Sequence, residues 1–239
     1  MIRFYAPDIE TTAKLPADES AHAVRVLRRR PGDEVEVVDG RGTLYRCRLV
    51  TDDHRGAVVE IVGRVPLPKV WKPYITVAVA PTKHLDRMEW LVEKLVEIGV
   101  DRIVPLRCAR SERKEIKAER LERIAVSAMK QSLKAVMPRI DPMTSLSSFL
   151  SETRCTGEEC YIGYCDAETP RLLLAKAYTP GADVKILIGP EGDFSPEEVV
   201  SARAAGYIPV TMGDNRLRTE TAALVGCDTI QILNQLDGF

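Results

Sequence analysis

The chain has 239 residues, of which 45% are hydrophobic and 29% are charged, and its formal net charge is −1. This composition is typical of a soluble globular protein, long enough for a small domain joined to a larger one, and we expect two domains. No apolar run approaches the roughly 18 residues needed to cross a bilayer, and the first ten residues lack the basic and apolar segments of a signal peptide. We therefore expect a cytoplasmic protein that does not enter the membrane.

The near-neutral net charge gives no overall attraction to nucleic acid, but charge can be concentrated locally. Eight basic residues and four glutamates lie between Arg102 and Arg123, and a second basic cluster, RVLRRR, spans Arg25 to Arg30. Both clusters are candidate contacts for phosphate groups.

The first seventy residues alternate short β-like runs with turn signals. The run DEVEVVD is followed by the turn GRG at Gly40 to Gly42 and then by the runs TLYRCRLV and AVVEIVGRV. This alternation predicts a small antiparallel barrel or sheet, preceded by one short helix around SAHAVRVLR. The segment from Pro66 to Pro73 holds three prolines and is typical of a linker, so we expect one domain over residues 1–70 and a second over residues 74–239.

From Tyr74 onwards, predicted strands alternate with predicted helices. The strand ITVAVA precedes a helix over LDRMEWLVEKLVEIGV that ends at Gly99, and RIVPL precedes a long helix from about Lys117 to Val136. Three further strands follow, in CYIGYC, VKILIG and YIPVTMG, and then a last helix over TETAALVGCDTIQILNQL. This order predicts an α/β fold with a mostly parallel sheet.

Six cysteines are scattered through the chain rather than framing a small secreted scaffold, so we expect reduced thiols and no required disulfide. Cys155, Cys160 and Cys165 repeat every five residues, which raises the question of a metal site. No fourth ligand of the usual kind lies nearby, and Cys160 and Cys165 fall in an apolar, strand-like run. We expect no metal, and the sequence assigns these three cysteines no other role.

Two glycine-containing loops follow predicted strands, at the edge of the sheet where α/β proteins bind ligands. The first lies in LIGPEGDFSPEEV, and the second is MGDNRLRTETA, residues Met212 to Ala222. The first loop leads into a helix whose start is already satisfied, because Ser195 and Glu198 have capping-box spacing and Pro196 occupies the first helical position. Neither loop carries a phosphate-binding or dinucleotide-binding fingerprint.

The chemistry of the first loop argues against a phosphate ligand. Glu191 and Asp193 would place negative charge beside any pyrophosphate. A ligand with sugar hydroxyls, an amide-like base edge and a positive centre suits carboxylates and open backbone groups, and S-adenosylmethionine (AdoMet) has all three. The plainer alternative is a tight turn followed by a good helix cap. The doubly basic junction RLRTET in the second loop favours a functional site, although its arginines could also be structural.

These motifs together resemble the RsmE family, SPOUT-superfamily methyltransferases that modify N3 of a uridine in 16S ribosomal RNA. The paired segments LIGPEGDFSPEEV and MGDNRLRTETAAL resemble the family's C-terminal signature. RFYAPDI and HAVRVLRRRPGDEVEVVDGRG resemble its N-terminal PUA-like RNA-binding domain, and KHLDRMEWLVEKLVEIGV, the SER at Ser111 to Arg113 and KQSLKAVMPRI resemble its middle. The resemblance therefore extends over nearly the whole chain.

The resemblance implies a C-terminal SPOUT-type α/β domain, with a mostly parallel sheet and a trefoil knot, and a small N-terminal PUA-like β-barrel domain. The knot is an exception to the rule that chains avoid threading loops. The resemblance also implies a homodimer and AdoMet as cofactor. The residues expected to bind the cofactor are Ile188, Gly189, Pro190, Glu191, Gly192, Met212, Gly213, Leu217 and Arg218.

Methyl transfer from a sulfonium to uridine N3 needs no acid for the leaving group, but N3 must lose a proton. The site should therefore stabilise a developing uridine anion and accept a proton. We expect Arg218 to supply the positive charge and Glu220 to act in catalysis, with Glu191 as the alternative proton acceptor. Either glutamate could instead cap a helix or bind the ribose.

The target base must be unstacked before it can react, so the flanking 16S rRNA has to be held. For any single arginine a solvated surface charge is the simpler explanation. The residues expected to hold RNA phosphates are Arg3, Arg25, Arg28, Arg29, Arg110, Arg113 and Lys114.

Two other classes of function stay open at this point. One is an RNA-binding assembly factor that has the fold without catalysis, which failure to bind AdoMet would favour. The other is an oxidoreductase with a nucleotide cofactor, which the absence of a dinucleotide fingerprint disfavours.

Overall fold

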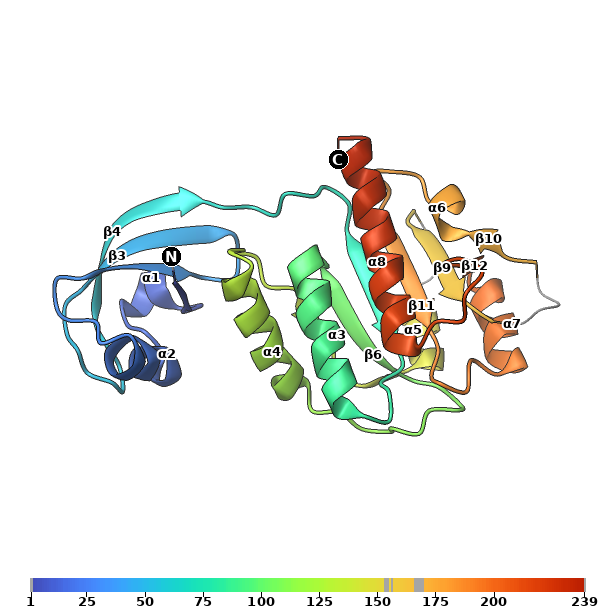
Figure 1. Ribbon diagram of the computed structural model, residues 1–239, viewed down its shortest axis with the longest axis horizontal. Helices are drawn as coiled ribbons and strands as arrows, with labels where there is room; N and C mark the ends of the chain where they lie inside the picture. Colours follow the sequence, from blue (N-terminus) through green and yellow to red (C-terminus); the bar gives the residue numbers. More distant parts are fainter. Residues whose placement is uncertain (1, 153–154, 156, 166–169, 239) are drawn as a thin grey trace. The chain divides into compact units, whose positions relative to one another are not determined.

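The computed structural model describes residues 2–152, 155, 157–165 and 170–238. The chain forms two compact units (Figure 1). The first contains Met1–Val70 and Val126–Met137, and the second contains Trp71–Ala125 and Pro138–Phe239. None of the helices in the described ranges is long and apolar enough to span a membrane.

The N-terminal unit is built on a four-stranded sheet with the strands in sequence order. The strands are β1 (Arg3–Tyr5), β2 (Glu34–Val38), β3 (Thr43–Leu49) and β4 (Val59–Pro66). β1 runs parallel to β2, and the other neighbours are antiparallel. Inward side chains alternate along β3 with exposed ones and pack into a core with Phe4 and Ile9. The predicted strands and the glycine turn between β2 and β3 are confirmed.

Three short helical segments cover this sheet. They are α1 (Ile9–Thr12), α2 (Ala17–Ala21) and a π-helical turn, η1 (His22–Val26), which continues α2. The helix predicted around SAHAVRVLR is therefore present, but its second half is wider than an α-helix. Glu19 of α2 is buried and forms an ion pair with Lys130.

Helix α4 (Ala118–Gln131) begins in the C-terminal unit, and its last residues belong to the N-terminal unit. The chain after α4 is bonded to the turn between β2 and β3, because the Gly42 N–H donates to the Ala135 carbonyl at 2.9 Å and the Met137 N–H to the Gly40 carbonyl at 2.8 Å. The helix ends before Leu133, whose φ is 56°, and so is shorter than the predicted Lys117–Val136 segment. The expected division near residue 70 did not include this returning segment.

The C-terminal unit is built on a parallel sheet. In spatial order its main strands are β10 (Leu172–Leu173), β12 (Ile208–Thr211), β9 (Glu159–Gly163), β11 (Val184–Ile188), β5 (Ile75–Val79), β6 (Arg102–Arg107) and β7 (Arg139–Ile140). A further strand, β8 (Thr144–Ser145), pairs with β6. All described pairings in this sheet are parallel, which confirms the predicted α/β arrangement.

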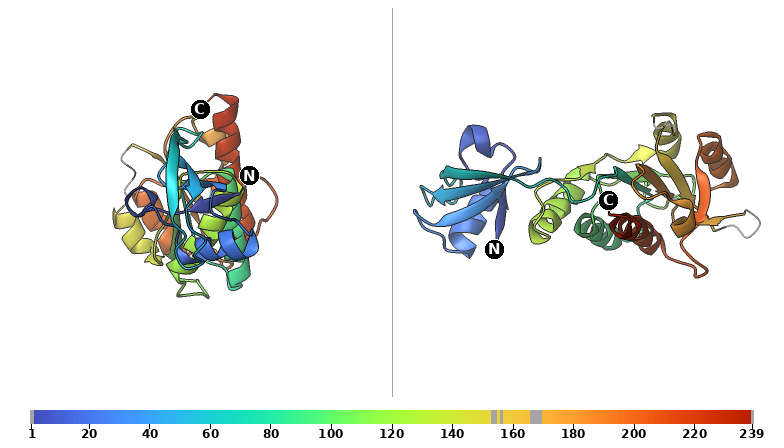
Figure 2. Two further views of the ribbon diagram at one scale, coloured as in Figure 1. Left: turned by 90° about the vertical axis from the view of Figure 1, so that its left-hand side faces the viewer. Right: turned by 90° about the horizontal axis from the view of Figure 1, so that it is seen from above.

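Helices cover both faces of this sheet (Figure 2). On one face lie α3 (Leu85–Ile98) and α8 (Thr219–Leu236), which pack against each other. The buried apolar residues of α3, from Met88 to Val96, lie in the core. On the other face lie α5 (Leu146–Glu152) and α7 (Pro196–Ala204), whose apolar residues form one core with Ile162 and Leu187 of the central strands. A one-turn helix, α6 (Leu174–Ala177), follows β10.

The predicted start of α7 is confirmed in detail. Ser195 accepts a hydrogen bond from the Glu198 N–H at 3.3 Å, the Ser195 N–H donates to the Glu198 carboxylate at 2.9 Å, and Pro196 opens the helix. The short elements α5, α6, β7, β8 and β10 were not predicted, because two to seven residues are too few to show a period.

The expectation that all six thiols are reduced is wrong for one pair. Cys155 and Cys160 form a disulfide between the segment after α5 and the second residue of β9. Cys47, Cys108, Cys165 and Cys227 are free. The pairing depends on the distance between two segments in space, which residue spacing does not give.

The start of β5 depends on Asp101. Its carboxylate accepts hydrogen bonds from the Trp71 indole N–H at 3.0 Å and from the Ile75 N–H at 2.9 Å. We expect Asp101→Ala to lower the free energy of unfolding by about 1–3 kcal/mol, because two largely buried donors lose their acceptor. Asp101→Asn retains an acceptor oxygen and should cost less. Equal urea-unfolding curves for the Ala and Asn variants would contradict this role.

Candidate active site

A cavity of about 530 Å³ lies at the edge of the parallel sheet where the central strands end. It is lined by the segments that follow β5, β9, β11 and β12, together with the first residues of α8. Because these strands are parallel, their carboxyl ends lie at one edge, and four segments distant in sequence converge there. Both glycine-containing loops singled out in the sequence contribute to its walls.

The two loops are joined directly by a buried hydrogen bond. The Thr219 hydroxyl, at the first position of α8, donates to the Gly189 carbonyl at 3.1 Å. Gly189 also lies tightly against Phe194, since a Cβ built on it would be 3.0 Å from the phenyl ring and 3.2 Å from the Phe194 backbone nitrogen. A side chain at this position would therefore require Phe194 or the loop after β11 to shift.

Two arginines hold the loops around the cavity by binding backbone carbonyls. Arg110 donates to the Gly192 carbonyl at 2.9 Å and to the Phe194 carbonyl at 3.3 Å. Arg113 donates to the carbonyls of Thr82 at 3.2 Å and Lys83 at 2.6 Å. Both arginines were expected to bind RNA phosphates, and the structure gives each of them a role within the protein.

The acidic residues of the site are also bonded within the protein. The Glu191 carboxylate accepts from the Lys83 N–H at 3.0 Å, which ties the loop after β11 to the loop after β5. The Glu220 side chain is 9% exposed and forms an ion pair with Arg87 of α3 at 3.2 Å. Because burial makes a lone carboxylate costly, Arg87 stabilises the charge on Glu220.

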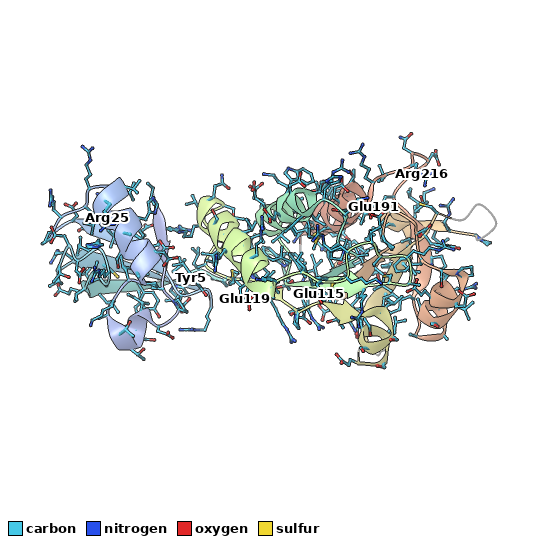
Figure 3. The ribbon with its side chains drawn as sticks, turned by 90° about the horizontal axis from the view of Figure 1, so that it is seen from below. Tyr5, Arg25, Glu115, Glu119, Glu191 and Arg216 are labelled. Carbon is cyan, nitrogen blue, oxygen red and sulfur yellow. A yellow bond between two sulfur atoms is a disulfide. The ribbon has the colours of Figure 1, made fainter. Side chains whose placement is uncertain are left out.

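Arg216 and Arg218 are different, because they are exposed and their side chains have no ion pair or hydrogen bond among the described residues. Both line the cavity, and Arg218 is the residue that precedes α8. Figure 3 shows Arg216 and Glu191 on neighbouring loops of this unit. The guanidinium groups of Arg216 and Arg218 are available to bind an anionic ligand or to stabilise negative charge that develops during a reaction.

The structure brings most of the expected cofactor residues together. Gly192 and Gly213 do not line the main cavity. Gly213 instead lines a second cavity of about 460 Å³, which shares several residues with the first. The expected site residues that line the main cavity are Ile188, Gly189, Pro190, Glu191, Met212, Leu217, Arg218 and Glu220.

The remaining residues expected to bind RNA lie mostly in the N-terminal unit. Arg3 is largely buried, pairs with Glu36 at 3.2 Å and donates to the Leu133 carbonyl. Arg29 forms an ion pair with Asp33, with 4.0 Å between the Arg29 Nη1 and the Asp33 Oδ2. Those that are exposed and unpaired among the described residues are Arg25, Arg28 and Lys114. Arg28 has a φ of 55°, and Figure 3 shows Arg25 on the helical segment of this unit.

Several cavity residues were not expected from the sequence. Arg87 was missed because its partner, Glu220, lies 133 residues further along the chain. Cys165 and Arg171 line both cavities, but the sequence between them gave no motif. No group of three or more His, Cys, Asp or Glu side chains that could hold a metal ion occurs in the part of the chain that the structure describes.

Comparison with known proteins identifies the family. Residues 71–231 match the RNA methyltransferase domain, and residues 15–62 match the RNA methyltransferase PUA domain. The ribosomal RNA small subunit methyltransferase E of Mycobacterium bovis is 30% identical over 238 residues, covering 95% of this chain and 88% of that protein. The chain belongs to the RsmE family.

Solved structures similar to this RsmE chain share both of its units. A probable rRNA methyltransferase from Porphyromonas gingivalis is 48% identical, with a TM-score of 0.93 over 99% of this chain and 100% of that one. A ribosomal RNA small subunit methyltransferase E from Neisseria gonorrhoeae, solved bound to S-adenosyl methionine, is 28% identical, with a TM-score of 0.81 and 98% coverage of both chains. These similarities confirm the SPOUT-type α/β fold with an N-terminal PUA domain, and the trefoil knot stays a prediction.

The ion pair between Arg87 and Glu220 predicts a coupled effect on stability. Arg87→Met should lower the free energy of unfolding by about 1–3 kcal/mol at neutral pH, because it leaves a buried carboxylate without its cation. The double variant Arg87→Met/Glu220→Gln should recover part of the lost free energy of unfolding. If urea unfolding shows that the losses of the two single variants simply add in the double variant, the ion pair does not contribute to stability.

The free cysteines should differ sharply in reactivity. Burial, together with the charge of Glu198, raises the pKa of Cys108 to about 12, burial raises the pKa of Cys47 to about 11, and Cys227 is buried with a raised pKa. Cys165 is exposed at the cavity. At pH 8 we expect iodoacetamide to modify Cys165 in the native protein and to leave the other three unmodified, because the thiolate is the reactive form. Mass spectrometry that finds equal labelling of all four would contradict this.

Proposed function

We propose that this protein transfers a methyl group from AdoMet to N3 of a uridine in the 16S RNA of the small ribosomal subunit. The observation that carries the proposal is the main cavity, which the loop after β11 and the loop after β12 form in a member of the RsmE family. Support comes from the name of the M. bovis relative and from the N. gonorrhoeae relative that was solved with S-adenosyl methionine.

The residues around the main cavity suit AdoMet. Its volume of about 530 Å³ is within the range of small-molecule sites, roughly 300–1,000 Å³. Met212 and Leu217 supply apolar surface and loop backbone for a flat base, and Glu191 supplies a carboxylate for the ribose hydroxyls or a positive centre. AdoMet, when bound, supplies an electrophilic methyl group on a sulfonium.

The basic groups at the start of α8 are placed to stabilise the nucleophile. Loss of the N3 proton spreads negative charge over the uracil oxygens, so a positive group beside them lowers the barrier. Arg218 is unpaired among the described residues and lines the cavity, and the first turn of α8 has no side-chain cap, so its N–H groups add positive potential. We propose Arg218 as the stabilising residue.

Two glutamates are proposed as proton acceptors. Glu220 is fixed by Arg87, and taking up a proton would weaken that ion pair. Glu191 is exposed and holds the Lys83 N–H through one carboxylate oxygen. Glu220 is our first choice because it lies two residues after Arg218, in the first turn of α8. The pH dependence of single-turnover methylation in Glu220→Gln and in Glu191→Gln distinguishes the two candidates.

The second cavity is the proposed position of the acceptor nucleotide. It is open, about 460 Å³ in volume, and is bordered by Arg171, Arg216, Asp214 and Asn215. The two arginines suit a phosphate and the amide suits a base edge. Arg25, Arg28 and Lys114 are proposed to hold flanking RNA, whereas Arg3, Arg110 and Arg113 contribute mainly to the fold.

The family resemblance adds two further parts to the proposal. One is a homodimer, which sedimentation of the purified protein tests. The other is a cytoplasmic location, where ribosomal subunits are assembled.

The function is tested by incubating the protein with labelled AdoMet and unmodified small ribosomal subunits, with protein-free 16S RNA and transfer RNA as controls. We expect label in the small subunit, mapped by mass spectrometry to a 3-methyluridine. AdoMet binding without label in any RNA would contradict the proposed RNA substrate but would support the proposed cofactor site. Failure to bind AdoMet would favour an RNA-binding assembly factor without catalysis.

Gly189→Ala should raise the Kd of AdoMet about tenfold, because the added Cβ would push Phe194 or the loop away from its position beside the cavity. Gly56→Ala is the matched control, since a Cβ there meets nothing within 4 Å. Unchanged affinity in Gly189→Ala by isothermal titration would show that the cofactor does not bind next to this loop.

Arg218→Ala should lower the single-turnover methylation rate about 100-fold or more, because a positive charge next to the developing anion is lost. Arg218→Lys retains a charge and should keep part of the rate. A normal rate in Arg218→Ala at saturating AdoMet and RNA would exclude the proposed role.

A further inference from the structure

The Tyr164–Cys165 segment, which directly follows β9, forms part of the cavity wall and is held by one side chain from a neighbouring loop. Cys165 lies two residues after the end of β9, and its N–H donates to the Asp193 carboxylate at 3.0 Å. The other carboxylate oxygen of Asp193 accepts from the Phe194 N–H at 2.8 Å. Both oxygens of Asp193 are therefore bonded to backbone, and one of these bonds joins the ends of two adjacent strands.

The backbone at Asp193 has an unusual conformation for a residue with a side chain. Its φ is 61°, and its N–H closes a turn onto the Pro190 carbonyl at 2.9 Å. Glycine adopts this conformation at the lowest cost, and aspartate and asparagine tolerate it better than most other residues. Strained positions that persist next to a ligand cavity are candidates for a functional role. At Asp193 the strain is offset by hydrogen bonds that glycine could not make.

A second side chain holds the same loop. The Arg171 guanidinium donates to the Tyr164 carbonyl at 3.0 Å, one residue before the Cys165 N–H that Asp193 binds. Asp193, Cys165 and Arg171 line both the main cavity and the second one. The position of the Tyr164–Cys165 segment therefore sets the shape of the wall that is common to the main cavity and the second cavity.

We propose that Asp193 is a positioning residue that fixes the Tyr164–Cys165 segment, and with it the wall between the AdoMet cavity and the acceptor cavity. The proposal rests on the proposed function, because AdoMet is the ligand whose affinity reports on the wall. Asp193 acts through the Cys165 backbone and needs no contact with either substrate.

Two substitutions separate the hydrogen bond from the backbone conformation. Asp193→Gly relieves the strain and removes the acceptor. Asp193→Asn keeps one side-chain oxygen that can accept from the Cys165 N–H, gives up the acceptor for the Phe194 N–H, and keeps a residue that tolerates positive φ. Asp53→Gly is the matched control, because it removes a similar bond, from the Arg55 N–H to the Asp53 carboxylate at 2.9 Å, in the N-terminal unit.

We expect Asp193→Gly to raise the Kd of AdoMet about three- to tenfold, which corresponds to the loss of the hydrogen bond that holds the Cys165 N–H, with no fall in Tm, because the relief of backbone strain offsets the two lost bonds. Asp193→Asn should lose less affinity than Asp193→Gly, and Asp53→Gly should bind AdoMet as the wild type does. Amide hydrogen exchange at Cys165 should be faster in Asp193→Gly than in Asp193→Asn. Alkylation of the Cys165 thiol should likewise be faster in Asp193→Gly than in Asp193→Asn.

The outcomes distinguish this inference from the proposed function. If the wild type binds AdoMet and Asp193→Gly binds it equally well, the positioning role is overturned and the proposed function stands. An equal loss of affinity in the Asn and Gly variants, or an unchanged Cys165 amide exchange rate in the Gly variant, also overturns it. If the wild type does not bind AdoMet at all, the proposed function fails and this inference fails with it.

Discussion

The hydrogen bond from the Thr219 hydroxyl to the Gly189 carbonyl is the constraint on which the rest of the site depends. It joins the loop after β11 to the start of α8, and so joins the two segments that the family signature comprises. The parallel sheet brings these segments to one edge, but an edge alone leaves the loops free to move apart. Because the bond is buried, its loss would leave a carbonyl unsatisfied as well as separate the loops. The dense packing of Phe194 against Gly189 then fixes the cavity wall.

The charged side chains of the site fall into two sets: acids that already have partners within the protein, and arginines that have none among the described residues. Glu191 and Glu220 are bonded to a backbone N–H and to Arg87, so their positions are set before any ligand arrives. Arg216 and Arg218 have no such partner in the described part of the chain. Preorganised acids beside available cations suit a reaction in which the substrate gains negative charge as it loses a proton. This division favours methylation at a weakly acidic ring nitrogen over chemistry that begins with an anionic phosphate.

The sequence predicted regular, strongly patterned elements well and long-range contacts poorly. Helix α8 was predicted over the residues it occupies, since its apolar residues recur at helical spacing from Thr219 to Leu236. The ligand-binding edge could be predicted too, because glycine loops after buried strands have a physical meaning. Three contacts could not be predicted: the ion pair of Arg87 with Glu220, the disulfide between Cys155 and Cys160, and the hydrogen bond from the Cys165 N–H to Asp193. Each depends on distances between segments that only the folded chain defines.

The hydrogen bond between Thr219 and Gly189 assembles the proposed AdoMet site. Isothermal titration of AdoMet into Thr219→Val and Thr219→Ser tests this most directly. Valine matches the shape of threonine but has no donor, whereas serine keeps the hydroxyl. We expect Thr219→Val to weaken AdoMet binding about tenfold or more, and Thr219→Ser to bind AdoMet nearly as the wild type does. Equal affinity in the valine variant and the wild type would contradict the claim that this bond assembles the site.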